Sequence, residues 1–551
     1  MEVSLLMTDF ITKFRFQILL GSILLVHILG MTNDIFNGDS ALYASIAKNM
    51  AESGDWLILN SVMQENWIDK PHLAFWIWAV FIKVFGNTNF GFKLPSLLAL
   101  LVLLRYVFLF SKKHYDESTA WTSVIVLSSS LHIFISTNDV RIDIFLLTFI
   151  MGAIYHLQQY LNSHQIIQLL IGAFLAAMAV MTKGIFVVIP IGVSVLVTIC
   201  HQKKFRWLLS WHWLLAAFVF LGGILPALYA LMVQFTHFTD SHILGQKVSN
   251  YLQFFFWDSQ FGRFNSNLGQ VQSNGDPFFY LHTILWSFAP WSLLLLMTFF
   301  LKKNPFKEYI STACFAVLFV IISISKTQLS HHVLILLPFL SIILAVIYRV
   351  TLWRLQHPLI LFAGYVFFFM ILIAGLYLTY FVLEISIGKH IIILILVISI
   401  LFIMSKFLID QRILILLTSI SLFLGLYLNT ILYPEILKYQ AGKVASDFLK
   451  KNPKYSVVEE FYANISLLNF YSPIPLKNTK LKNMDELLMK RKQILYTNEY
   501  GVSYLSEHNA NYIILDTFYD YRTTVLSLNF LRKSSRENKL EKLMLVEINP
   551  I

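Results

Sequence analysis

Apolar segments long enough to cross a bilayer recur along the chain from residue 14 to residue 433. A spanning helix needs about 20 mostly apolar residues, and lipid offers backbone amides no hydrogen-bond partner, so such segments must be helical. Only 13% of the 551 residues are charged, against about 25% in a soluble domain. The sequence therefore predicts an all-α polytopic membrane domain. The expected spans are 14–31, 93–110, 118–135, 141–160, 165–181, 184–201, 211–235, 278–300, 309–325, 331–348, 358–383, 390–405 and 412–433.

Basic residues indicate how these spans are oriented. If the N-terminus lies inside, nearly every inside loop is basic, as the positive-inside rule requires. This pattern explains the net charge of +11 better than nucleic-acid binding does, and it favours an odd number of spans with a cytoplasmic N-terminus. No clear small-x-small cleavage site follows the apolar run 16–30, so we expect an uncleaved first span. The inside clusters are Lys13 and Arg15, Lys112 and Lys113, Lys203 to Arg206, Lys302 to Lys307, Arg349 and Arg354, and Lys406 and Arg412.

Three outside segments are long and polar: 32–92, 236–277 and the tail from 434. The tail alternates short β-like runs with helical ones, which predicts a small α/β domain over 434–551, separate from a membrane domain over 1–433. Both cysteines lie within apolar runs, so a disulfide framework is not expected. The expected strands are 455–459, 493–496 and 511–516, and the expected helices are 441–451 and 484–492.

The densest group of polar side chains, 33–44, follows the first span directly. Asp39 precedes an amphipathic helix expected over 40–53. One interpretation is that Asp39 only caps this helix. The other is that its carboxylate acts at the membrane surface as a general base, accepting a proton from an acceptor hydroxyl or phosphate.

Lys70 lies in a second polar stretch and precedes a helix expected to start near Pro71, since proline suits the first helical position. The ammonium group of Lys70 could neutralise a phosphate, helped by the positive end of the helix dipole. The alternative is a solvated or snorkelling lysine.

Together these motifs resemble the bacterial GT-C glycosyltransferases, and most of all the lipid A aminoarabinose transferase branch of the protein O-mannosyltransferase superfamily. The resemblance implies thirteen spanning helices and a periplasmic C-terminal domain. It also implies that Asp39 is the catalytic carboxylate and that Lys70 contacts the donor phosphate, supported by Tyr43 and Asp69. The branch usually has Asp-Glu where this chain has Asp39-Ser40, which leaves the acceptor and metal chemistry open. The motifs are Asp39-x-x-x-Tyr43-Ala44, Gly54-Asp55-Trp56, Asp69-Lys70-Pro71, Trp76-Ile77 and Phe85-Gly86-x-x-x-Phe90-Gly91.

Three further residues resemble family positions on the outer side. Asp143 fits an Arg/Leu-x-Asp motif, with Asp139 a near rival. Asp143 would orient the acceptor, a substrate amine or a catalytic partner, or else only pair locally with Arg141. Lys183 lies in a Thr-Lys-Gly turn and is either a phosphate ligand or a topological charge. Arg263 suits a bidentate phosphate clamp, or is simply solvated.

The stretch 325–332 completes the resemblance, with Lys326 and His331 matching and Gln328 and Ser330 departing from the family pattern. The neighbouring His332 suggests a metal, but adjacent residues rarely converge on one ion. His237, Asp240 and His242 form a second weak cluster. We therefore assign no metal ligand and no required cofactor, and leave a divalent metal open.

The sequence thus predicts an enzyme of the EC 2.4 class in the bacterial inner membrane, with Asp39 and Asp143 catalytic and Arg141 and His331 supporting. The donor phosphate would bind Lys70, Lys183, Arg263 and Lys326. The expected donor is a sugar on undecaprenyl phosphate, an amino sugar being one candidate, transferred with inversion. Lipid A is the favoured acceptor and a protein or surface glycan the alternative. We expect a monomer with no nucleic-acid partner. A transporter is less favoured, because the polar motifs lie at helix ends rather than at the midplane.

Overall fold

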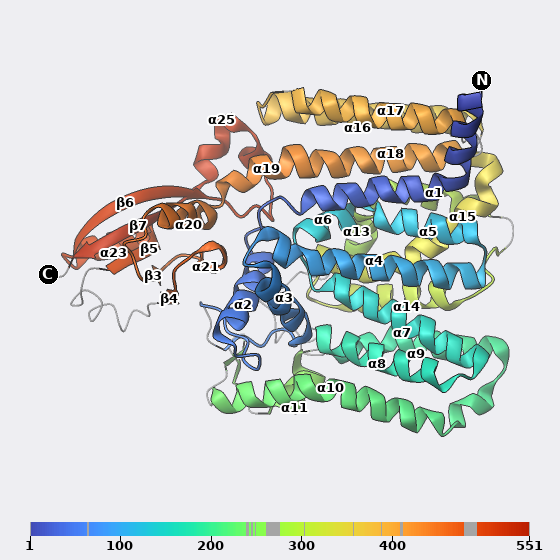
Figure 1. The fold of residues 1–551 in the computed structure, drawn as a ribbon, viewed down its shortest axis with the longest axis horizontal. Helices are drawn as coiled ribbons and strands as arrows, with labels where there is room; N and C mark the ends of the chain where they lie inside the picture. Colours follow the sequence, from blue (N-terminus) through green and yellow to red (C-terminus); the bar gives the residue numbers. More distant parts are fainter. Residues whose placement is uncertain are drawn as a thin grey trace.

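The computed structural model describes residues 2–62, 66–238, 242–243, 246–247, 250–259, 276–301, 304–355, 357–386, 388–407, 411–478 and 493–549. A bundle of long helices carries a smaller domain with a β-sheet at one end (Figure 1). We call this the domain end of the bundle, and the other the opposite end.

Long helices make up most of the bundle. Their bounds are α1 (Glu2–Gly30), α4 (Asn89–His114), α5 (Glu117–Ser128), α6 (Leu131–Asn138), α7 (Asp143–Ser163), α8 (Ile166–Lys183), α9 (Val188–Gln202), α10 (His212–His237), α13 (Phe279–Ser287), α14 (Ile310–Ile324), α15 (Leu337–Leu355), α16 (Pro358–Tyr377), α17 (Gly388–Phe407) and α18 (Arg412–Tyr427). Shorter helical turns extend or join them: η1 (Ile185–Val187), η2 (Phe205–Leu209), α11 (Tyr251–Gln253), η3 (Phe254–Asp258), η4 (Trp291–Phe300), η5 (Ser330–Leu336), η6 (Leu378–Val382), η8 (Leu428–Leu432), α19 (Tyr433–Ile436) and η9 (Leu437–Tyr439).

The prediction of a multi-pass, all-α membrane domain is confirmed. Within the described ranges, nine helices are long and apolar enough to span, or ten if the bent pair α5 and α6, which meet at 53°, is one span. The predicted spans 278–300 and 309–325 fall on helical segments that are shorter or more irregular. The predicted span 390–405 lies within α17, which has 20 residues but is not among the nine. The count of thirteen therefore stays a prediction.

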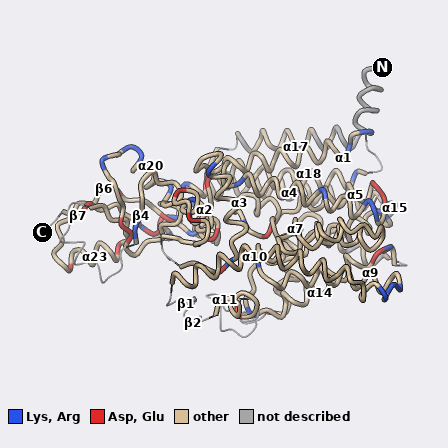
Figure 2. Tube along the Cα trace, turned by 60° about the horizontal axis from the view of Figure 1, so that its bottom comes forward, with Lys and Arg blue, Asp and Glu red and all other residues tan. Residues whose placement is uncertain are grey.

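Charged residues lie mainly at the two ends of the bundle, with few between them (Figure 2). Lys112, Lys203 and Arg206 are at the opposite end, where α4 and α9 finish. This is the distribution expected of helices that cross an apolar layer.

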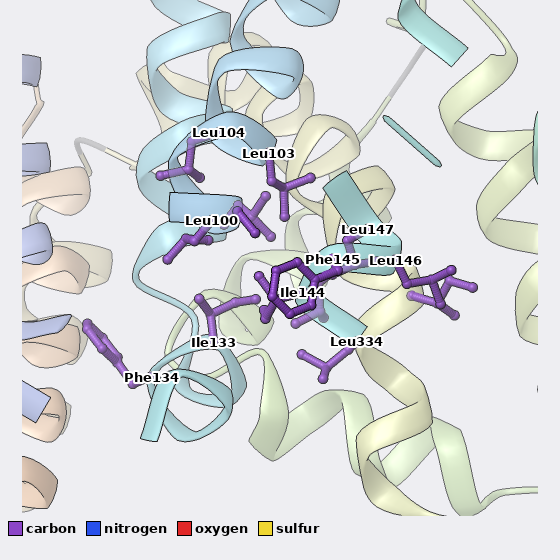
Figure 3. Packing of buried hydrophobic residues seen from close by; sticks show 14 of the residues in the cluster. Leu100, Leu103, Leu104, Ile133, Phe134, Ile144, Phe145, Leu146, Leu147 and Leu334 are labelled. Carbon is purple, nitrogen blue, oxygen red and sulfur yellow. The ribbon is translucent and has the colours of Figure 1, made fainter. Parts of the chain in front are cut away.

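The core at the centre of the bundle is built from aliphatic and aromatic side chains of α4, α6, α7 and η5 (Figure 3). Leu100 of α4, Ile133 of α6 and Leu334 of η5 are fully buried around the start of α7. In α7, Ile144 and Phe145 enter this core directly after Asp143. The polar residues that precede them are therefore held at a rigid helix start.

Two helices, α2 (Asp39–Ser53) and α3 (Leu73–Phe85), cover the domain end (Figure 1). Helix α3 begins two residues later than Pro71 predicts. Pro71 and His72 instead form the turn before it, where the buried ring of His72 bonds the Leu57 carbonyl at 2.9 Å.

The C-terminal domain contains a five-stranded sheet in the order β4-β3-β5-β7-β6. Strands β4, β3 and β5 are parallel, whereas β7 is antiparallel to both β5 and β6. Of the predicted elements, the strands at 493–496 and 511–516 and the helix at 441–451 are present, and the first strand starts three residues later than expected. The helix expected at 484–492 lies outside the described residues. The elements are α20 (Ala441–Lys451), β3 (Val458–Phe461), α21 (Ser466–Tyr471), β4 (Leu476–Asn478), β5 (Gln493–Asn498), α23 (Glu499–Glu507), β6 (Asn511–Asp520), α24 (Leu528–Leu531), α25 (Lys533–Arg536), η11 (Glu537–Lys539) and β7 (Glu541–Asn549).

Helix α21 docks the C-terminal domain onto α2 through buried polar contacts. The ammonium of Lys48 donates to the carbonyls of Asn469 and Ser472 at 2.7 and 2.8 Å. The Asn469 amide donates in turn to Ser45 Oγ at 2.6 Å and Asn49 Oδ1 at 2.9 Å. Helix α2, which begins with Asp39, is therefore held by the C-terminal domain as well as by the helix bundle.

We predict that Lys48→Met weakens this docking, because two buried carbonyl oxygens lose their donor at a cost of about 1–3 kcal/mol. The midpoint of thermal unfolding in detergent should fall. Lys112→Met is the control: it removes an exposed ion pair to Glu117 and should leave the midpoint unchanged. Equal midpoints for the two variants would contradict the docking role of Lys48.

Candidate functional site

Asp39 is the first residue of α2 and does not cap it. The capping position is Gly38, whose φ of 103° suits glycine, and no side-chain cap bond forms there. The Asp39 carboxylate instead meets the guanidinium of Arg141. A negative charge in the first turn also interacts favourably with the helix dipole. The capping interpretation is therefore wrong, and Asp39 is available for another role.

Arg141 connects two carboxylates. Its Nη1 donates to Asp39 Oδ2, while Nε and Nη2 donate to Asp139 Oδ2 at 3.1 and 2.6 Å. Burial alone would lower the pKa of Arg141. The charges of Asp139 and Asp39 outweigh this effect and raise the pKa of Arg141 above its usual value. The Asp39 side chain is 51% exposed and that of Asp139 only 11%. Asp139 thus holds Arg141 from the buried side, and Asp39 presents its carboxylate to open space.

Tyr43 lies one helical turn after Asp39 in α2 and packs against aromatic residues next to it. Its buried ring stacks on Trp78 at 5.8 Å and meets the edges of Phe75 and Trp67. Burial, reinforced by the charge of Asp39, raises the pKa of Tyr43 well above its usual value. The phenol is therefore neutral and supports the site by packing.

Asp143 pairs with Lys183, at 2.5 Å between Oδ1 and Nζ. The predicted local pair of Asp143 with Arg141 is wrong, since Arg141 binds Asp139 and Asp39. Lys183 ends α8, and Gly184 with φ of 111° turns the chain directly after it, as the sequence predicts. Both side chains are nearly buried, 6% and 10% exposed. Separating the two charges at this depth would leave each of them buried and uncompensated. The two side chains are therefore held in one arrangement.

A cavity brings Lys70 and Lys183 together from different parts of the chain. Lys70 also pairs with Asp69 at 2.5 Å. The lining combines cationic and polar side chains with aliphatic and aromatic ones, so its chemistry suits an amphipathic ligand with an anionic head. Its lining residues are Asp69, Lys70, Lys183, Phe186, Ser259, Ile321, Ile322, Ser325, His332 and Ile335.

The other predicted residues lie around this cavity or beyond the described ranges. His331 is half-buried, its ring contacts that of His332 at 4.7 Å, and the charges of Arg141, Lys183 and Lys70 act on it. His332 lines the cavity and meets Tyr280 Oη at 3.2 Å. Lys326 is exposed, next to Ser325 of the lining. Arg263 lies outside the described residues.

Two supports of the site do not emerge from the sequence alone. Lys93 is fully buried in α4 and donates to the carbonyls of Asn33 and Gly30 at 2.8 and 3.2 Å. The sequence signal for Lys93 is the presence of a lysine within an apolar run. Gln440 lies beyond the last span, and its amide accepts from the Asn37 N–H at 2.6 Å and donates to the Ile35 carbonyl at 3.0 Å. Nothing in the sequence relates these two segments.

Among the residues that the structure describes, no group of three or more His, Cys, Asp or Glu side chains could hold a metal. Of the weak cluster at 237–242, Asp240 lies outside the described ranges. A divalent metal therefore stays an open prediction.

Comparison with solved structures decides the fold. A crystal structure of ArnT from Cupriavidus metallidurans bound to undecaprenyl phosphate matches with a TM-score of 0.70 and 14% identity, covering 96% of this chain and 97% of that one. The apo structure of the same protein matches with a TM-score of 0.71. The chain has the GT-C fold.

Sequence comparisons agree with the GT-C fold. Residues 69–229 match the family described as dolichyl-phosphate-mannose-protein mannosyltransferase. The undecaprenyl phosphate-alpha-4-amino-4-deoxy-L-arabinose arabinosyl transferase 2 of Proteus mirabilis is 24% identical over 56% of this chain and 54% of its own length. The corresponding transferase of Shewanella sediminis is 24% identical over 47% and 45%. The chain thus spans about half the length of these relatives. The resemblance to the aminoarabinose transferase and O-mannosyltransferase superfamily is confirmed.

We predict that Lys183→Met destabilises the protein by about 3–5 kcal/mol, because it leaves the buried Asp143 carboxylate unpaired. The double variant Lys183→Met/Asp143→Leu should recover most of this loss. Thermal unfolding of the parent, the single variant and the double variant in detergent tests the pair. A single variant as stable as the parent would show that Asp143 does not depend on Lys183.

Proposed function

We propose that this chain is an integral-membrane glycosyltransferase that moves a sugar from undecaprenyl phosphate to an acceptor at the membrane surface. The observation that carries the proposal is the cavity that joins Lys70 and Lys183 to an apolar wall. A polyprenyl phosphate has both features, a charged head and an apolar tail. The names of the relatives and the undecaprenyl phosphate in the ArnT structure support this donor.

Asp39 acts as the general base in this proposal. Its exposed carboxylate takes the proton of the acceptor oxygen as that oxygen bonds the anomeric carbon. The bond from that carbon to the donor phosphate oxygen breaks, and undecaprenyl phosphate leaves. Direct displacement inverts the anomeric centre. Arg141 orients the Asp39 carboxylate while Asp139 holds Arg141.

Lys70 and Lys183 stabilise the negative charge that develops on the departing phosphate. Asp69 and Asp143 position these two lysines through their ion pairs. This gives Asp143 an indirect part in catalysis, through Lys183. We also include Arg263 and Lys326 in the proposal as further phosphate ligands. Only the family motifs support these two assignments.

The proposed acceptor is lipid A, with an amino sugar as the transferred group, as in the names of the relatives. We place the domain end in the periplasm, because the basic loops of the opposite end belong inside under the positive-inside rule. The family description over residues 69–229 supports a protein acceptor as the second candidate.

We predict that Asp39→Asn lowers the turnover rate by about 10²-fold or more, since the amide cannot accept the proton. Lys70→Met should lower it by a similar factor through loss of phosphate stabilisation. Sugar transfer is measured with the purified chain in liposomes. Glu52→Gln, at the exposed end of the same helix, and Lys83→Met, exposed on α3, are matched controls. Full activity of both site variants would remove the assignment.

We further predict that deleting the gene removes the sugar from lipid A, as mass spectrometry of extracted lipid A would show. Unchanged lipid A together with missing glycans on secreted proteins would reverse the choice of acceptor. Both acceptors unchanged would contradict the proposal.

A further inference from the structure

The chain between β6 and β7 leaves the sheet and returns to the bundle. We call residues 521–540 the return segment; it contains α24, α25 and η11. Its inner side is firmly held. Phe530 stacks on Tyr521 at 3.6 Å and meets the edge of Tyr439 at 5.5 Å. Arg536 donates to Tyr439 Oη at 2.7 Å and lies 3.8 Å from the Glu435 carboxylate. The return segment is therefore fixed to the end of the last spanning helix.

The outer side of the return segment is apolar and exposed. Val525, Leu526 and Leu528 are 60%, 40% and 69% exposed. Single exposed aliphatic residues are common, but three within four positions need a partner surface. Exposed cationic side chains flank them: Arg522, Arg532 and Lys533.

An ion pair places the return segment at the level of the bundle where one of the spanning helices ends. Lys533 Nζ lies 3.5 Å from Glu384 Oε2, and Glu384 lies two residues after the end of the span Pro358–Val382. Figure 1 shows α25 beside the domain end of α16 and α17. The last turns of that span expose three aromatic rings, as at a membrane–water interface: Tyr377 at 57%, Tyr380 at 55% and Phe381 at 65%.

We propose that the outer side of the return segment inserts into the leaflet at the domain end. Val525, Leu526 and Leu528 enter the boundary between headgroups and acyl chains, and Arg522 and Arg532 bind phospholipid phosphates. The occupant is the bilayer around the chain, because the apolar side chains continue the aromatic belt and the cations match anionic headgroups. The C-terminal domain then has a second attachment besides its docking on α2. The proposal is independent of the proposed reaction.

The test uses the full chain with exposed Cys200 replaced by serine. Val525→Cys and Leu528→Cys are each labelled with an environment-sensitive dye and placed in phospholipid vesicles free of lipid A. Tyr500→Cys on α23 is the matched control, since Tyr500 is 78% exposed and α23 lies on the part of the sheet domain away from the bundle (Figure 1). Spin labels just below the lipid headgroups should quench the dyes at 525 and 528 several-fold more than the dye at 500.

Equal quenching at all three positions would overturn the proposal. So would quenching at 525 and 528 that needs added lipid A, which would make the surface an acceptor site. Efficient disulfide cross-linking between copies through Leu528→Cys would instead indicate an interface between chains. Quenching at 525 and 528 that is stronger with anionic than with zwitterionic vesicles, and weaker after Arg522→Gln/Arg532→Gln, would support the headgroup contacts.

Discussion

The guanidinium of Arg141, held between two carboxylates, is the interaction on which the site depends. Asp139 binds it from the buried side at the end of α6, and Asp39 binds it from the start of α2. Removing either partner would leave charge poorly compensated at the membrane surface, where desolvation is costly. The contact therefore sets the position of α2 relative to the spanning helices. It also leaves the Asp39 carboxylate half-exposed, which is compatible with the general-base role proposed for it.

The C-terminal domain contributes to the same geometry from the other side. Gln440 binds the backbone at Asn37, two residues before Asp39, and α21 accepts the buried ammonium of Lys48 within α2. The helix that begins with Asp39, the proposed general base, is thus held by both parts of the molecule. This arrangement pre-organises the site, since little side-chain or backbone freedom is left to lose when a substrate binds.

The sequence predicts the membrane domain well because spanning helices are dictated by hydropathy and by backbone hydrogen bonding within each helix. Irregular helical segments are harder. The stretch 278–300 reads as one apolar run, yet it divides into α13 and η4. In the C-terminal domain, the strand β4 has no distinct signal, because it is three residues long and forms by pairing with β3. Local patterns cannot report such non-local pairing.

For the site, the sequence by itself singled out the residues to which we assign the proposed chemistry, through motifs that place Asp39, Lys70 and Lys183 near helix ends. Only the tertiary structure decided how they pair. Charged side chains at the same end of a helix bundle can form ion pairs in several combinations. Which pairs form depends on the burial of the side chains and on the distances between them. Arg141 binds Asp139 and Asp39, and Asp143 binds Lys183, because α7 packs along α8 and the close-packed core fixes where each of these side chains can reach.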